Sequence, residues 1–460
     1  MPNFRSGRTS SDHSTSHRCE IPRSGAKTST VEAHAVAVPH VVRKERSARI
    51  TSPWAVGAIV AAFYTLLVTP GLISNPYQFV NIGRQYVHKG TSSAAIDEHA
   101  RAMNHRIGYD GQFYYFLAAD PVHGKDYMDD PGIIYSRIGY PITARALSGG
   151  NAVLVPYMMV LVNVLAAVGG TLAVAFFLRR HGLPPALALV YGLYPGLVLS
   201  VLRDLTEPMA FALAATALVI FDARSKRRLL GAGALFGLAM LTRETVALFP
   251  AILALALLVG VGTSFEWKIR LRWSNLARSI AFAELAFAPL LLWRHIVAAK
   301  LPHQTIQEPF VGGEHHVAGV AGTAGSFLTA LVPFHAIAKQ WPWTGDNVSD
   351  LLTVFLPALV WAAIALVVLR RKPTMLGPLF VLANVAVFVV FLPTPIAVDY
   401  GSLGRASLGV LLGVFITLPL IDPVFGARAR LIRSTLVLWS LPLWVVLGIL
   451  LHALGPKYVW

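Results

Sequence analysis

The stretch NAVLVPYMMVLVNVLAAVGGTLAVAFFL, residues 151–178, contains no charged side chain, and Arg179 and Arg180 follow it directly. A helix needs about 20 consecutive apolar residues to cross the hydrocarbon core of a bilayer. The stretch is long enough, so it predicts a transmembrane helix that ends at a pair of basic residues.

The same pattern recurs along the chain. Further apolar runs lie at Pro53–Ile73, 185–202, 208–221, 229–242, 245–263, 279–299, 350–369, 375–393, 405–421 and 434–454. Two of these runs, 208–221 and 229–242, are short for a span, so we expect about eleven transmembrane helices, within a range of nine to twelve. The sequence therefore predicts an all-α, polytopic membrane protein.

The composition supports this fold class. Hydrophobic residues make up 55% of the 460 positions and charged residues only 13%, whereas a typical soluble domain has about 25% charged residues. These values exclude disordered, collagen-like and disulfide-built proteins. The only cysteine, Cys19, has no partner within the chain, so no internal disulfide is possible.

The polar segments divide the chain into regions. Residues 1–50 are rich in Ser, Thr, His and Arg without apolar periodicity, which predicts a disordered basic tail or an over-extended translation start. Residues 51–460 form the predicted membrane domain. Within it, the polar stretches 75–150 and 300–349 are expected to be loops on the outer side, the first of them with interfacial helices.

The net charge of +16 is explained by topology. Most Lys and Arg residues lie in the tail and in alternate short loops, which is the positive-inside pattern. This pattern predicts a multi-pass protein of the inner (plasma) membrane with a cytoplasmic N-terminus, whose basic loops contact anionic membrane lipids. A nucleic-acid partner is not expected, because no nucleic-acid-binding motif is present.

The first outer loop contains YDGQFYYFLAADP, residues 109–121. Phe113, Phe116 and Leu117 are spaced as on one face of a helix, which predicts an amphipathic helix in the membrane interface. Asp110 at its start has two interpretations. Its carboxylate either caps the free N–H groups of the first turn or acts as a general base, and both roles need the same oxygens.

A second charged group, RDLTEP at residues 203–208, precedes an apolar run. The proline after Glu207 suits the first turn of a helix, with Thr206 as the expected cap. A helix N-terminus beside an arginine is an anion site, which would give Arg203 a ligand. Alternatively, Arg203 forms an internal ion pair with Asp204 or Glu207.

Arg243 and Glu244 interrupt the long apolar stretch 229–262. They lie at the outer tip of a hairpin if the stretch folds back, or inside the protein if it is one long helix, since ionisable residues at membrane depth face the interior or a wet cavity. Arg405 begins another apolar run. Together with Arg203, these arginines suggest a phosphate site, because Arg binds phosphate bidentately.

Three other motifs are less specific. Arg137, in YSRIGYP at residues 135–141, is either an anion ligand or an ordinary loop arginine. Glu314-His315-His316 is not expected to bind a metal, because adjacent His residues rarely face the same way. Trp341-Pro342-Trp343 suits an interfacial anchor or a surface for stacking a sugar. No nucleotide-binding motif is present, and no cofactor is expected.

Several of these motifs resemble the GT-C superfamily of membrane glycosyltransferases, and in particular bacterial membrane proteins of cell-surface glycopolymer formation. The likeness covers about residues 55–420. It rests on Asp110-Gly111-Gln112-Phe113-Tyr114-Tyr115, Asp120-Pro121, Arg137 to Pro141, Thr206-Glu207-Pro208 and Thr242-Arg243-Glu244. The resemblance implies a polyprenyl-phosphate sugar donor, a glycan or lipid acceptor and chemistry on the outer side of the membrane.

The resemblance also implies roles for individual residues. Asp110 would deprotonate or orient the acceptor, with Asp120 and Glu207 as further candidate catalytic acids. Many members have two adjacent acids in this loop, whereas here Gly111 follows Asp110. The residues expected to contact substrate are Gln112, Tyr114, Arg137, Arg203, Arg243, Glu244 and Arg405, and no metal is required.

Two other functions remain open at this point. A transporter or flippase for lipid-linked glycans would place its polar residues at mid-membrane depth, in broken helices of two related halves. A non-catalytic membrane protein of envelope assembly would leave Asp110 on a lipid-facing or fully solvated convex surface.

Overall fold

The computed structural model describes residues 52–83, 108–128, 131–261, 265–267, 272–301, 351–390 and 404–440. Within these ranges the chain is helical, and the extended pairings are two isolated bridges, Val261 with Trp267 and Glu266 with Met375. The all-α prediction is confirmed. The predicted tail and the 314–316 and 341–343 motifs lie outside the described residues.

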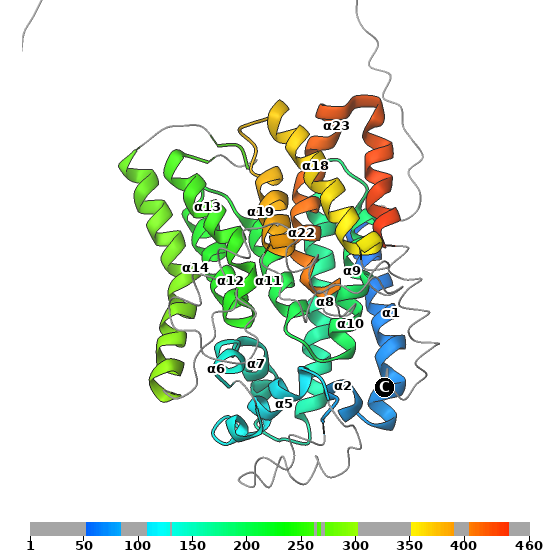
Figure 1. Ribbon diagram of the computed structural model, residues 1–460, viewed down its shortest axis with the longest axis vertical. Coiled ribbons are helices and arrows are strands. Elements are labelled where there is room, and N and C mark those ends of the chain that lie inside the picture. The colour runs from blue at the N-terminus through cyan, green and yellow to red at the C-terminus, as the bar shows by residue number, and fades with distance from the viewer. Residues whose placement is uncertain are drawn as a thin grey trace, which may run out of the picture. The chain divides into compact units, whose positions relative to one another are not determined.

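Helices account for nearly all of the described chain (Figure 1). Those up to residue 202 are α1 Pro53–Ser74, α2 Tyr77–Val80, α5 Gly111–Ala119, η1 Gly124–Tyr127, α6 Pro131–Ser136, α7 Gly139–Leu147, α8 Val155–Arg180, η2 Pro185–Ala188, α9 Leu189–Gly192 and α10 Pro195–Leu202. Those that follow are α11 Glu207–Ile220, α12 Lys226–Thr242, η3 Glu244–Ala247, α13 Leu248–Val259, α14 Trp273–Lys300, η4 Leu351–Phe355, α18 Leu356–Arg371, α19 Gly377–Val390, α22 Leu408–Thr417, η5 Leu418–Leu420, α23 Ile421–Phe425 and η6 Gly426–Arg428.

Several of these helices are long and apolar enough to cross a membrane. Five segments meet both criteria among the described residues: Pro53–Ser74, Val155–Arg180, Trp273–Lys300, Leu352–Arg371 and Gly404–Ser440. The pair Pro185–Gly192 and Pro195–Leu202, bent by 48°, makes a sixth if it is one span. The described residues thus support a helical membrane protein with five or six clear spans rather than about eleven.

Two of the predicted runs form helices that are short for a span. The predicted run 208–221 forms α11, which has only 14 residues, and a helix of that length rises about 21 Å, less than the hydrocarbon thickness. The run 229–242 lies in α12, whose first turn consists of Lys226, Arg227 and Arg228. Both helices are covered by neighbours, since α11 packs between α8 and α12, and α12 packs on α14.

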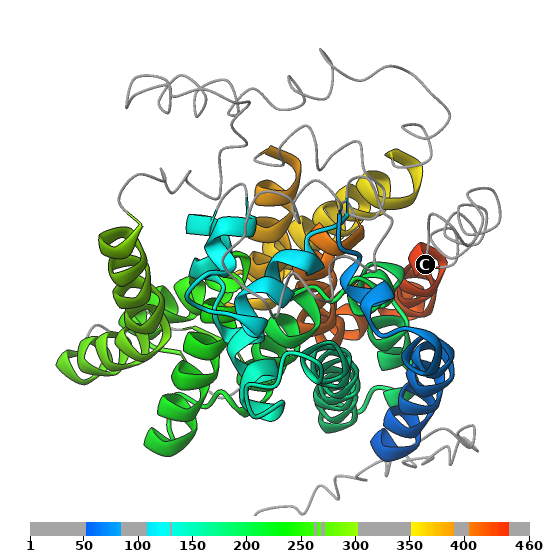
Figure 2. The ribbon, with the colours of Figure 1, turned by 90° about the horizontal axis from the view of Figure 1, so that it is seen from below.

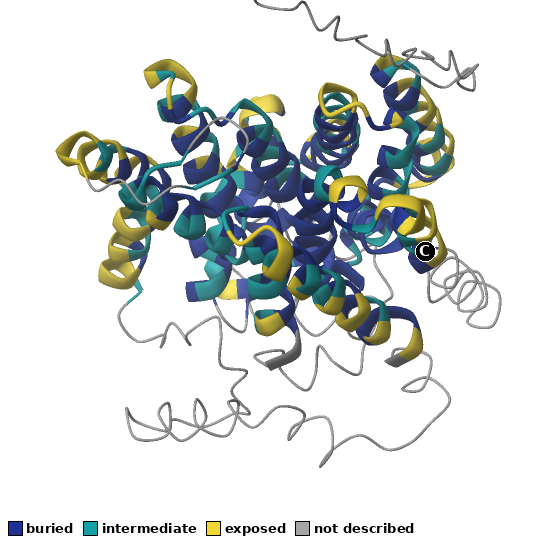
Figure 3. Cartoon of the chain, turned by 90° about the horizontal axis from the view of Figure 1, so that it is seen from above, coloured by how far each residue is buried: buried dark blue, intermediate teal, exposed yellow. Residues whose placement is uncertain are grey.

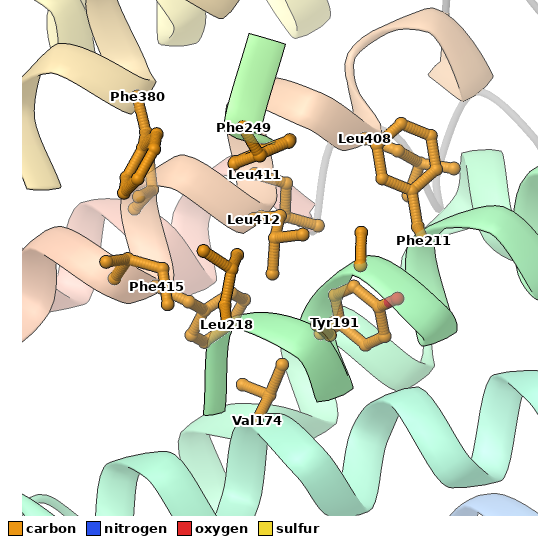
Figure 4. Close-up of a cluster of buried hydrophobic side chains, with 14 of the residues drawn as sticks. Val174, Tyr191, Phe211, Leu218, Phe249, Phe380, Leu408, Leu411, Leu412 and Phe415 are labelled. Atoms are coloured by element: carbon orange, nitrogen blue, oxygen red, sulfur yellow. The ribbon is translucent and has the colours of Figure 1, made fainter. Parts of the chain in front are cut away.

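A continuous apolar core joins the helices. Figure 4 shows side chains from six helices that meet in its centre. They are Val174 of α8, Tyr191 of α9, Phe211 and Leu218 of α11, Phe249 of α13, Phe380 of α19 and Leu408, Leu411, Leu412 and Phe415 of α22. Buried residues occupy the middle of the helical assembly and exposed ones its outward faces (Figure 3). Large apolar side chains such as Leu66, Ile73 and Leu292 are exposed there, as a lipid-facing surface requires.

Short helices from the first polar loop gather at one end of the long helices. In Figures 1 and 2, α2, α5, α6 and α7 lie across that end. Helix α5 packs against α2, α7, α8 and η1. Nearly all of α5 is therefore buried, namely Gly111, Gln112 and Tyr114 through Ala119. An amphipathic interfacial helix would expose one polar face, so this prediction is wrong for α5.

The chain breaks at both predicted charged groups. Helix α12 ends at Arg243, whose φ of −159° and ψ of 121° are extended, so the alternative of one long helix over 229–262 is wrong. Helix α11 begins at Glu207 with a proline in its first turn, as predicted. Thr206 holds the N-cap position, but its side chain makes no capping hydrogen bond, because its hydroxyl has another partner.

Two glycines of α12 provide a test of the helix packing. A Cβ added at Gly237 would overlap the carbonyl oxygen of Leu285 in α14, whereas a Cβ at Gly231 would lie 3.6 Å from Ile220 Cδ1, an ordinary contact. We expect Gly237→Ala to destabilise the protein by about 1–3 kcal/mol, because α12 and α14 must separate. Gly231→Ala is the matched control, and its better helix propensity should leave stability unchanged or raised.

The measurement is the thermal unfolding of both purified variants in detergent. Equal melting temperatures for the two would show that α12 does not pack this closely on α14.

Candidate functional site

Four charged residues, far apart in the sequence, form a chain of ion pairs. Arg405 Nη2 lies 3.0 Å from Asp110 Oδ2, and Arg405 Nε lies 3.6 Å from Glu207 Oε1. Arg243 Nη1 lies 3.1 Å from the same Glu207 oxygen. We refer to Asp110, Arg405, Glu207 and Arg243 as the ion-pair chain. The structure thus brings together four of the residues that the sequence singled out.

Glu207 is the centre of the ion-pair chain. Its side chain is fully buried in the first turn of α11, where the positive end of the helix dipole favours a carboxylate. Arg243 also donates from Nη1 to Thr206 Oγ1 at 3.3 Å. A buried carboxylate is costly unless it is paired, and Glu207 is paired with two guanidinium groups.

Asp110 is the accessible end of the ion-pair chain. Its side chain is 45% exposed, against 9% for its partner Arg405. Asp110 holds the N-cap position of α5 but makes no side-chain capping bond, so the capping interpretation is wrong and its oxygen contacts Arg405 instead. A Cβ at Gly111 would overlap the carbonyl oxygen of Arg203, which explains why a second acid cannot stand next to Asp110.

A second ion pair lies beside this chain. Arg137 donates from Nε to Glu244 Oε2 at 3.0 Å and from Nη2 to Glu244 Oε1 at 2.6 Å. Its Nη1 donates to the hydroxyl of Tyr114 at 3.3 Å. Burial alone would raise the pKa of Glu244, but the charge and hydrogen bonds of Arg137 lower that pKa to about 2. Arg137 and Glu244 therefore form an ion pair with each other, joined by two hydrogen bonds.

Arg203 lies next to the chain over an aromatic ring. Its guanidinium carbon is 5.4 Å from the centroid of Tyr109, and that of Arg405 is 5.3 Å from the same centroid. Such cation–π contacts hold a guanidinium in place without neutralising its charge. Two arginines are thus gathered around the residue that precedes Asp110.

Two predicted site residues have structural contacts instead. Asp120 Oδ1 accepts from the N–H groups of Val122 and His123 at 3.1 Å each, and Oδ2 contacts His123 Nδ1 at 3.0 Å. Asp120 therefore closes the turn after α5 and is not part of the ion-pair chain. Gln112 Oε1 accepts from the N–H of Gly83 at 2.7 Å, which fixes Gly83 against α5.

The sequence did not single out a buried polar group behind the site. Asn163 Nδ2 donates to the Tyr140 hydroxyl at 2.8 Å, and that hydroxyl lies 3.3 Å from Asp204 Oδ1 and 3.1 Å from Met159 O. Burial raises the pKa of Asp204 well above its usual value. Asn163, a polar residue inside the apolar stretch 151–178, was the signal that could have revealed the group.

The arrangement offers paired carboxylates and guanidinium groups. Among the described residues, no three His, Cys, Asp or Glu side chains are grouped so as to hold one ion. Comparison of the chain with known protein families, curated proteins and solved structures finds no match. The functional argument therefore depends on the geometry of the site.

The Arg137–Glu244 pair should act as a unit. We expect Arg137→Met to destabilise the protein by about 3–5 kcal/mol, because Glu244 would be left buried without a partner. The double variant Arg137→Met/Glu244→Leu should recover most of that loss. Thermal unfolding of the single and double variants measures the coupling, and additive effects would contradict a direct pair.

Acid should weaken the same pair. Because the folded-state pKa of Glu244 is lowered from 4.5 to about 2, its contribution to stability is complete above pH 4.5 and is lost as the pH falls toward 2. We expect the Arg137→Met/Glu244→Leu variant to lose less stability than the wild type over this interval. Parallel curves of melting temperature against pH would exclude this contribution.

Proposed function

We propose that the protein is a GT-C-type glycosyltransferase that transfers a sugar from a polyprenyl-phosphate donor to a glycan or lipid acceptor on the outer side of the membrane. The observation that supports this proposal most strongly is the ion-pair chain, in which an accessible carboxylate, Asp110, lies beside the buried Arg405, and Glu207 links Arg405 to the partly buried Arg243. A base next to cations is what transfer from a phosphate leaving group needs.

Each part of the ion-pair chain has a role in this reaction. Asp110 takes the proton of the acceptor hydroxyl while the hydroxyl oxygen of the acceptor bonds to the sugar C1. General base catalysis of this kind is worth about 10²–10⁴-fold in rate. The bond from C1 to the phosphate oxygen breaks, and polyprenyl phosphate leaves with the electron pair. Arg405 and Arg243 stabilise the charge that develops on that phosphate.

The membrane arrangement we propose is the one that the charges predict. The protein lies in the plasma membrane with about eleven spans and a cytoplasmic N-terminus. The five long apolar segments and the bent pair Pro185–Gly192 and Pro195–Leu202 supply six of these crossings. The prenyl chain of the donor would lie along the exposed apolar faces of the helices.

One feature supports a transporter of lipid-linked glycans as a second candidate. The segments Pro185–Gly192 and Pro195–Leu202 form a helix pair bent by 48°, and broken helices are typical of transporter binding sites. The charged residues, however, gather in one group with the accessible Asp110 at its end. A transporter would move the lipid-linked sugar without releasing polyprenyl phosphate.

Substitution of Asp110 tests the proposed chemistry. We expect Asp110→Asn to lower sugar transfer by about 10²-fold or more, because the amide cannot accept the proton. The assay incubates the protein in liposomes with labelled polyprenyl-phosphate sugars and measures released polyprenyl phosphate. Asp120→Asn is the matched control and should keep its activity, because Asp120 contacts Val122 and His123 in the turn after α5, outside the ion-pair chain.

Full activity of Asp110→Asn would remove Asp110 from the mechanism. Translocation of the intact donor without release of polyprenyl phosphate would favour the transporter.

A further inference from the structure

Arg405 contacts two carboxylates that differ greatly in solvent exposure. Glu207 is fully buried, whereas the Asp110 side chain is 45% exposed. The guanidinium also lies over the ring of Tyr109. Arg405 itself is only 9% exposed, so Asp110 is the accessible member of the pair.

The charges of the ion-pair chain are balanced. Asp110 and Glu207 contribute two negative charges, and Arg405 and Arg243 contribute two positive charges. An anionic phosphate added to this group would place three anions on two cations in a partly buried setting, where like charges repel strongly. Exchange of one carboxylate for the phosphate avoids this repulsion within the ion-pair chain.

We propose that the donor phosphate displaces Asp110 from Arg405, so that donor binding itself frees the base. This inference rests on the proposed function and adds the order of events: the donor binds first, and the acceptor is activated afterwards. In the resting state a carboxylate oxygen of Asp110 faces Arg405. After the exchange, that oxygen is available to an acceptor hydroxyl.

Glu207 cannot be the carboxylate that leaves. It lies in the first turn of α11 and contacts both Arg405 and Arg243, and removing it would leave two guanidinium groups facing each other. Asp110 precedes α5 and is tied to the chain by one ion pair with Arg405. When Asp110 moves away, Glu207 and Tyr109 still hold Arg405 in position.

The exchange predicts that Asp110→Asn, which removes the proposed base, strengthens the binding of polyprenyl phosphate. In Asp110→Asn the phosphate no longer competes with a carboxylate for Arg405. We expect this variant to bind polyprenyl phosphate roughly two- to fivefold more tightly than the wild type, the range for a partly exposed ion pair. Arg405→Gln should lose most of the binding, and Asp120→Asn, which removes a carboxylate outside the ion-pair chain, should bind like the wild type.

The experiment measures the affinity of the full-length protein for polyprenyl phosphate in nanodiscs of neutral lipid, with melting temperatures to show that each variant is folded. Inorganic phosphate and nanodiscs containing phosphatidylglycerol form separate arms. Competition by inorganic phosphate with the same increase in Asp110→Asn supports the exchange at the phosphate group. An increase that depends on phosphatidylglycerol instead assigns Arg405 to membrane lipid and overturns the proposal.

Unchanged or weaker binding of polyprenyl phosphate by folded Asp110→Asn also overturns the exchange. The result is independent of the transfer assay. Tighter binding without sugar transfer in the wild type would support the exchange and remove the proposed glycosyltransferase activity. If sugar transfer depends on Asp110 but the variant does not bind polyprenyl phosphate more tightly, the glycosyltransferase activity is supported and the exchange is overturned.

Discussion

The site depends on one buried carboxylate, Glu207, held between Arg243 and Arg405. Glu207 begins α11, Arg243 follows α12, and Arg405 precedes α22, so a single acid ties together three parts of the helical assembly. Removing either partner of such a buried pair leaves an uncompensated charge, which costs far more than a surface pair contributes. The position of Arg405, and through it that of Asp110, follows from this constraint.

Close approaches of the backbone hold the charged segments next to one another. A side chain at Gly196 would overlap Gly404 O, directly before Arg405, and one at Gly111 would overlap Arg203 O. The hydroxyls of Tyr194 and Ser407 lie 2.6 Å apart at the same junction. The glycines therefore define where the helix starts can meet, and the ion pairs form at the points of contact.

Local signals in the sequence were enough to predict the helical class and the start of α11, and they offered the break at Arg243 as one of two alternatives. They could not predict which residues pair, because Asp110 and Arg405 are 295 positions apart and such a contact is set by tertiary packing. The apolar spacing in α5 predicted one buried face, but burial by α2, α7, α8 and η1 encloses nearly the whole helix. The role of Asp120 could not be predicted from the sequence, because a carboxylate before a proline looks the same whether it closes a turn or acts on a substrate.

Charge balance links the architecture to the chemistry we propose. Arginines near the hydrocarbon region are expensive when unpaired, so an anion site built from free arginines would burden the protein whenever the ligand is absent. Here internal carboxylates occupy Arg243 and Arg405, and the resting site carries little excess charge. A ligand that replaces one carboxylate keeps the site balanced in both states. The carboxylate it replaces is the accessible one, which is also the group best placed to take a proton from the second substrate.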